Sequence, residues 1–136
     1  MATMETAPNR TPFILAGIGA LLASIYWAGL TLLILSSVAG GAVSPTQVIL
    51  PVVLIALYGW RGLQLFKGDP AAARRILWLH GLGGIMALIG AASGSGVIVV
   101  LQGLKLVIHV FGVATAWWAI RTSDAARVQT AVARYP

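Results

Sequence analysis

Four long apolar runs, separated by short segments rich in glycine, proline and serine, make up most of the chain. Each run has about the 20 residues that an α-helix needs to cross a bilayer. Ser44-Pro45-Thr46-Gln47 has the form of a capping box with proline at the first helical position, and Asp69-Pro70 opens another helix. The pattern predicts helices at about 12–38, 45–67, 70–92 and 97–121, followed by a tail at 122–136.

The first apolar run raises the question of a secretory signal peptide. Phe13–Val38 is far longer than the roughly 7–15 apolar residues of a signal peptide. Ala39-Gly40-Gly41-Ala42 resembles a cleavage site, but the length favours a transmembrane helix, and we expect the segment to be retained. Thr11, which precedes Pro12, is the expected N-cap of this helix, and Pro51 is a candidate kink in the next one.

Composition places the chain in a membrane. Of its 136 residues, 59% are hydrophobic and 9% are charged, whereas a soluble domain has about 25% charged residues. We therefore expect an all-α integral membrane protein with a single four-helix transmembrane domain. Cysteine is absent, which excludes disulfides and thiolate chemistry. The net charge of +6 comes from residues at helix ends, where topology explains it, so we expect no nucleic-acid partner.

Basic residues are placed asymmetrically around the four spans. They lie before the first helix, around the connection between the second and third, and after the fourth: Arg10, Arg61, Lys67, Arg74, Arg75, Arg121, Arg127 and Arg134. The other two connections carry no charge. The positive-inside rule then predicts an antiparallel up-down bundle with both termini in the cytoplasm. We expect the protein in a bacterial inner (plasma) membrane.

Aromatic residues and the tail complete this picture. Those near the cytoplasmic helix ends have the placement of interfacial anchors: Tyr58, Trp60, Trp78, Trp117 and Trp118. Tyr26 and Trp27 lie deeper and are expected to be packing residues. The tail is expected to form either one short surface helix capped by Ser123 or a frayed terminus.

One face of the fourth predicted helix carries the main functional hypothesis. Gln102, Lys105 and His109 share this face, and Lys105 lies about 12 Å from its outer end at 1.5 Å per residue. A charge at membrane depth is costly and indicates a functional site. The acidic residues Glu5, Asp69 and Asp124 lie on the cytoplasmic side and are not expected to reach Lys105.

The Lys105 ammonium could therefore be stabilised in several ways. Water, carbonyls and a lipid phosphate could stabilise the ammonium, an acid of a partner subunit could pair with it, or it could bind a ligand or ion. A covalent Schiff-base adduct is least expected, because the carboxylate counter-ion and larger helical cage are missing. We predict that Lys105 faces protein or trapped water and contacts an anionic group of another molecule.

Two histidines allow a haem hypothesis. His80 and His109 lie on neighbouring predicted helices, which is the usual arrangement for axial haem ligands. Lys105, one turn from His109, would crowd the macrocycle. The alternative is an interfacial His80 with a hydrogen-bonded His109.

Small residues form two stripes at the spacing that lets helices approach closely. One comprises Ala16, Ala20, Ser24 and Ala28, and the other Gly83, Ala87 and Ala91. Stripes of this kind serve packing within the chain or contacts between subunits.

The sequence contains no acid pair, nucleophile–base spacing, phosphate loop or metal-ligand cluster, so an enzyme is not expected. The leading prediction is a small non-catalytic accessory subunit of a membrane complex or a homo-oligomer, without a cofactor. The alternative is a small transporter or channel component that handles an anionic solute through Lys105 and His109. A haem-bearing membrane anchor is a weaker third prediction.

Overall fold

The computed structural model describes residues 9–41 and 43–132, which are helical without any strand. The elements are α1 Thr11–Ala39, the short 3-10 helix η1 Pro45–Val48, α2 Ile49–Phe66, α3 Pro70–Ser93 and α4 Val97–Val132. α1, the combined η1–α2 segment, α3 and α4 are each long and apolar enough to cross a membrane. The predicted class of four apolar helices is confirmed to that extent, and it is consistent with an integral membrane protein.

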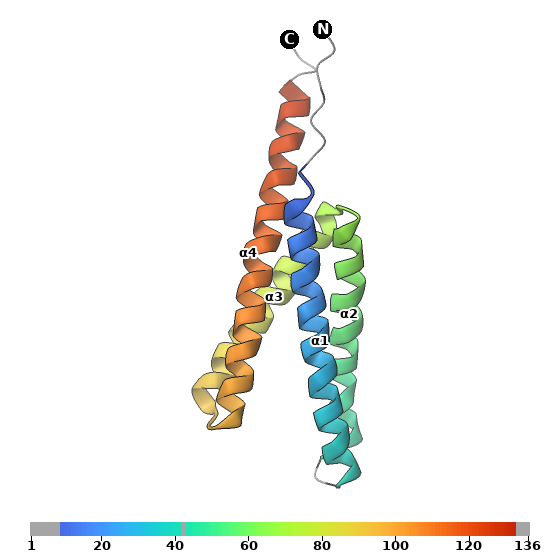
Figure 1. Ribbon diagram of the computed structural model, residues 1–136, viewed down its shortest axis with the longest axis vertical. Coiled ribbons are helices and arrows are strands. Elements are labelled where there is room, and N and C mark those ends of the chain that lie inside the picture. Colours follow the sequence, from blue (N-terminus) through green and yellow to red (C-terminus); the bar gives the residue numbers. More distant parts are fainter. Residues whose placement is uncertain (1–8, 42, 133–136) are drawn as a thin grey trace.

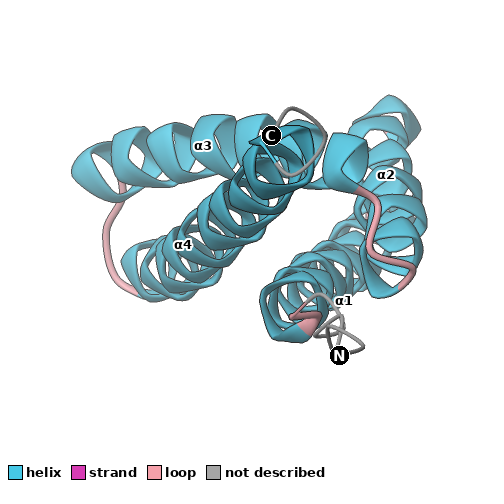
Figure 2. Cartoon of the chain, turned by 90° about the horizontal axis from the view of Figure 1, so that it is seen from above, coloured by secondary structure: helices cyan, strands magenta, loops and turns pink. Residues whose placement is uncertain are grey.

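The helices form two hairpins, α1 with α2 and α3 with α4 (Figure 1). The α2–α3 turn, the start of α1 and the end of α4 lie at one end of the bundle, here named the terminal end. The α1–α2 and α3–α4 connections lie at the opposite end, the loop end. Figure 2 shows the two pairs seen from above, with α4 beside α1. The hairpins meet at the terminal end and diverge towards the loop end (Figure 1).

Polar side chains cap the start of two helical segments, η1 and α3, as the sequence predicts. The Asp69 carboxylate accepts a hydrogen bond from the backbone N–H of Ala71 at 2.8 Å, and the Ser44 hydroxyl accepts from that of Thr46 at 3.4 Å. The expected cap at Thr11 is wrong: Thr11 is already helical, and its N–H donates to the Asn9 side chain at 3.0 Å.

The start of α2 differs from the expectation of a kink. The first turn is the 3-10 helix η1, and α2 begins at Ile49, so Pro51 lies in its first turn. The first four N–H groups of a helix have no intrahelical partner, so a proline there removes no helical hydrogen bond.

α4 is longer than predicted. The helix continues through Ser123 to Val132, in place of the expected break at 121 and a separate tail. Residues 113–132 contain no glycine or proline, so no helix breaker interrupts them. The Arg74 guanidinium and the Asp124 carboxylate, 3.1 Å apart, connect this extension to α3. The side chains of Arg74 and Asp124 are 56% and 50% exposed, so the pair contributes little stability.

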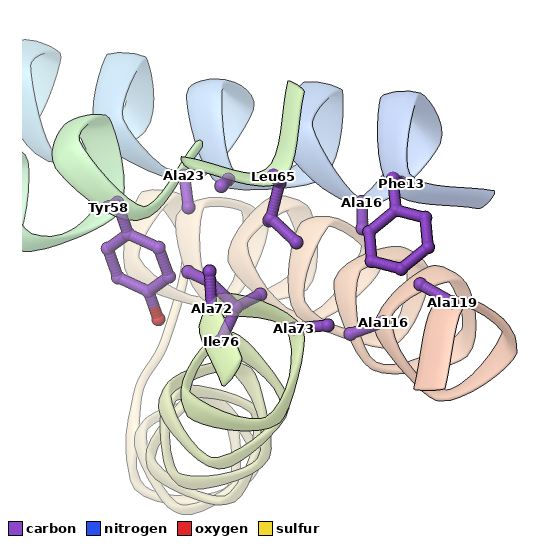
Figure 3. Packing of buried hydrophobic residues seen from close by; sticks show 11 residues of the cluster. Phe13, Ala16, Ala23, Tyr58, Leu65, Ala72, Ala73, Ile76, Ala116 and Ala119 are labelled. Carbon is purple, nitrogen blue, oxygen red and sulfur yellow. The ribbon is translucent and has the colours of Figure 1, made fainter. Parts of the chain in front are cut away.

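The core lies in the half of the bundle near the terminal end. Figure 3 shows that alanines from three helices surround a few larger side chains, namely Phe13, Tyr58, Leu65 and Ile76. Small side chains let the backbones approach: a Cβ on Gly19 would lie 3.2 Å from the Cα of Gly112. Tight contact of this kind supplies the van der Waals attraction that holds helices together in lipid.

Both small-residue stripes lie at contacts within the chain. Ala16, Ala20 and Ala87 are completely buried, and Ala28 and Ala91 are half-buried. The Ser24 hydroxyl donates to the Ile55 carbonyl of α2 at 3.2 Å. The stripe on α1 faces its neighbours in the bundle, and the stripe on α3 faces α4.

Candidate functional site

Lys105 lies inside the bundle, between α4 and α1. Its side chain is 8% exposed, and its Nζ is 4.8 Å from the centre of the Trp27 ring. An ammonium over an indole face is attracted by the ring's negative face. The acids of the described ranges, Asp69 and Asp124, are engaged at the terminal end in a helix cap and in the pair with Arg74. Lys105 therefore has no carboxylate partner among residues 9–41 and 43–132.

Two further polar atoms near this face of α4 are buried without a hydrogen-bond partner. They are the indole N–H of Trp27 and the side-chain oxygen of Gln102. The Gln102 amide packs against Gly90 of α3, where a Cβ would lie 2.7 Å from its Cδ. A buried polar group without a partner costs about 1–3 kcal/mol. The ammonium of Lys105 and the indole N–H of Trp27 are thus donors that lack an acceptor in the described structure.

His80 and His109 form a direct hydrogen-bonded pair between α3 and α4. Their Nδ1 atoms are 2.9 Å apart, and both rings are buried. One Nδ1 must carry the proton and the other must accept it, so two neutral rings have opposite tautomers. Neither Nε2 has a partner. One of them therefore carries an N–H and the other a free lone pair.

The pair is built from the same short motif on both helices. His80 and Gly83 on α3 have the spacing of His109 and Gly112 on α4. Because the helices are antiparallel, each ring lies over the glycine of the other motif: a Cβ on Gly83 would overlap the His109 ring, and one on Gly112 would overlap the His80 ring. The absence of two side chains thus creates the space for two imidazoles.

Tyr58 of α2 completes this cluster. Its ring centre is 5.0 Å from that of His80 and 6.0 Å from that of His109, and its hydroxyl donates to the Leu79 carbonyl at 3.0 Å. Tyr58 is 2% exposed, so its assignment as an interfacial anchor is wrong. The same holds for an interfacial His80, which is fully buried. The four other proposed anchors, Trp60, Trp78, Trp117 and Trp118, are exposed.

The histidine pair does not fit the axial ligands of one haem. An iron between two imidazoles separates their nitrogens by about 4 Å, twice a metal–imidazole bond of about 2 Å. The two Nδ1 atoms are 2.9 Å apart, and each Nε2 is packed against the opposite helix. No group of three or more metal-ligating side chains occurs in the described ranges either.

The structure brings together most of the residues singled out in the sequence. Lys105, His109 and Gly112 are buried on one face of α4, and Gln102 is half-buried on the same face. Sequence reasoning missed Trp27 and Tyr58 as members of the site. The repeated His-x-x-Gly spacing, His80–Gly83 and His109–Gly112, could have predicted the contact between α3 and α4, because a small residue opposite a ring permits close packing.

Comparison with known proteins adds no relationship. No protein-family model matches the chain, and no curated protein or solved structure is significantly similar to it.

Proposed function

We propose that this is a small, non-catalytic membrane protein that binds a small monovalent anion at Lys105 and moves it across a bacterial inner membrane. The observation that carries the proposal is the position of Lys105: inside the bundle, 8% exposed, and without a carboxylate among the described residues. A lysine at the centre of a membrane helix costs about 3 kcal/mol, and an anion would offset part of that cost.

The surrounding donors support an anion in preference to a cation or a neutral solute. The Trp27 indole N–H lies in the ring whose face Lys105 covers, and it has no acceptor. Both groups are hydrogen-bond donors, so a small anion bound beside them would supply the acceptor that each lacks. Lys105 supplies a single positive charge, so a monovalent anion neutralises the site.

The shape of the bundle supports access from the loop end. On the terminal side of Lys105 lie the buried histidine pair and then a closely packed apolar core, whereas the hairpins diverge towards the loop end (Figure 1). The distribution of basic residues favours a cytoplasmic terminal end. In this orientation the anion reaches Lys105 from outside the cell, and the alanine-rich core closes the cytoplasmic side in this conformation, so transport requires the core to open.

Anion binding can be measured through Trp27. Iodide titrated into the purified protein in lipid nanodiscs should quench one saturable part of the tryptophan emission. Lys105→Met should weaken iodide binding at least tenfold, because the charge that attracts the anion is removed. Trp27→Phe should remove the saturable quenching. The matched control is Lys67→Met, since Lys67 is the other lysine of the chain and is exposed at the end of α2.

Transport is measured with the same variants in proteoliposomes that contain a halide-sensitive dye. Chloride influx should depend on Lys105 and be unchanged in Lys67→Met. The proposal is wrong if iodide, chloride, nitrate and formate all fail to bind saturably, or if Lys105→Met binds iodide as tightly as the unmodified protein.

The orientation has its own experiment. A cysteine introduced at Ser95 should react with an impermeant thiol reagent in intact cells, whereas one at Ser123 should react only after lysis. The chain has no natural cysteine that would obscure the result. The reverse labelling pattern would place the terminal end outside.

A second candidate is the accessory subunit or homo-oligomer expected from the sequence. It is favoured by the divergence of the hairpins towards the loop end, where apolar side chains such as Leu32 and Val100 are 69% and 70% exposed. In this function a second subunit packs between the hairpins and supplies the acceptor for Lys105. Mass measurement in mild detergent distinguishes the two, because a lone monomer with anion binding supports only the first.

A further inference from the structure

The histidine pair lies beside the proposed anion site but takes no part in binding the anion. His109 follows Lys105 by four residues on the same face of α4, a spacing that places the two Cβ atoms about 5–6 Å apart. His80 bonds to His109 from α3, and Tyr58 covers both rings from α2. The chain contains only these two histidines.

The hydrogen-bonding pattern gives the pair the capacity for one added proton. In the neutral pair one Nε2 lone pair has no donor. A hydronium ion that reaches this buried nitrogen can transfer a proton to it and leave as water, after which both Nε2 atoms carry a proton and one proton still bridges the two Nδ1 atoms. The bridge at 2.9 Å is kept, and the charge of the pair changes from zero to +1.

The charge of Lys105 determines how favourable protonation of the histidine pair is. Two positive charges one helical turn apart repel strongly in a low-dielectric interior. An anion bound at Lys105 neutralises the ammonium and removes most of this repulsion. Protonation of the pair therefore becomes easier when the anion is present.

The other ionisable groups packed around the pair do not provide a competing charge. Tyr58 of α2 and Tyr26 of α1 are hydroxyl donors to the Leu79 and Leu101 carbonyls. Arg61, three residues after Tyr58, donates to the Gln64 side chain at 2.6 Å. Both described acids are engaged at the terminal end. Lys105 is thus the charge on α4 nearest in sequence to His109.

We propose that the His80–His109 pair takes up one proton when an anion binds at Lys105, which makes the protein a proton–anion symporter. This inference rests on the proposed anion site and adds its coupling ion. By linkage, protonation must strengthen anion binding by the same factor with which the anion strengthens protonation. The expected factor is about tenfold or more, within the usual range of coupling between sites.

The test is the pH dependence of iodide binding, measured by tryptophan quenching between pH 5 and pH 8. In the unmodified protein the affinity should rise about tenfold or more from the high to the low end. In the double variant His80→Gln/His109→Gln, iodide should still bind, but with an affinity that does not change with pH. Lys67→Met is the matched control: it lies outside the site on the surface and retains both imidazoles, so the pH dependence should remain.

A second measurement uses the unmodified protein and does not depend on whether the double variant folds. Protein labelled with ¹⁵N-histidine gives signals from His80 and His109 alone. Without anion at pH 7 the spectrum should show one protonated nitrogen in each ring. Iodide should convert it to the spectrum of a pair with charge +1, in which both Nε2 atoms are protonated and the Nδ1 atoms share one proton. Chloride should have the same effect.

The outcomes separate this inference from the proposed function. Saturable iodide binding with an affinity independent of pH, or histidine spectra unchanged by iodide, would overturn the proton coupling and leave the anion site standing. Absence of saturable binding at every pH would overturn both. A pH dependence that persists in the double variant would assign the proton to Lys105 itself and would also contradict the proposal.

Discussion

The two ends of the bundle are built differently. In the half of α1 near the terminal end, seven residues between Pro12 and Ala23 are buried, whereas Thr31 is the single buried residue in the half near the loop end. In α2, likewise, Tyr58, Gly62 and Leu65 are buried in the terminal half and Pro51 in the loop half. The buried residues of α1 and α2 are thus concentrated near the terminal end, while the Tyr26 hydrogen bond to the Leu101 carbonyl and the Trp27–Lys105 contact connect α1 with α4 nearer the loop end.

The polar cluster lies where these two halves meet. Trp27 lies just after the alanine-rich part of α1. Lys105 is the first buried residue of α4. Close packing on the terminal side contrasts with the divergence of the hairpins on the loop side. The proposed function therefore requires the anion to approach this boundary from the loop end.

The largest expected effect comes from overpacking the closed half. Ala20 is fully buried, and its Cβ lies 3.4 Å from the position of a Cβ on Gly62. Ala20→Leu should lower the free energy of unfolding by about 3 kcal/mol, because the added volume separates α1 from α2. Unfolding in detergent measures this loss. The control Ala114→Leu, on an exposed position of α4, should change the stability by less than about 0.5 kcal/mol.

A smaller effect is expected at the boundary itself. Gly112→Ala places a methyl group against the His80 ring and should lower the free energy of unfolding by about 1–3 kcal/mol. The reason is that the ring must shift, which weakens its hydrogen bond to His109. Gly103→Ala, on the same helix, meets no atom within 4 Å and should instead stabilise the protein slightly, since alanine is the better helix former. Equal effects of the two substitutions would contradict the reciprocal packing of the His-x-x-Gly motifs.

The smallest effect is expected where α4 extends beyond the core. Arg74→Gln removes the exposed ion pair with Asp124 and should change the free energy of unfolding by about 0.5 kcal/mol or less. The difference should vanish at high salt, because exposed charges are screened. A loss above 1 kcal/mol would show that this extension is a stabilising part of the terminal end.

Periodicity and composition were sufficient for the helices but not for their contacts. The four spans, the cap at Asp69 and the shared face of Lys105 and His109 follow from local sequence rules. Local rules failed at Tyr58 and His80, which look amphipathic and interfacial in sequence yet are buried by helices distant in the chain. The contact of Trp27 with Lys105 joins residues on α1 and α4, and no spacing within one helix encodes such a pair.

The position of a bound halide tests the central claim most directly. A structure determined with iodide, using its anomalous scattering, should show one ion within contact distance of the Lys105 Nζ and the Trp27 Nε1. The same peak should be absent from Lys105→Met and present in Lys67→Met. Absence of an anomalous peak at this position, or a carboxylate or phosphate group of another molecule bound to Lys105, would contradict a site for a small free anion inside the bundle.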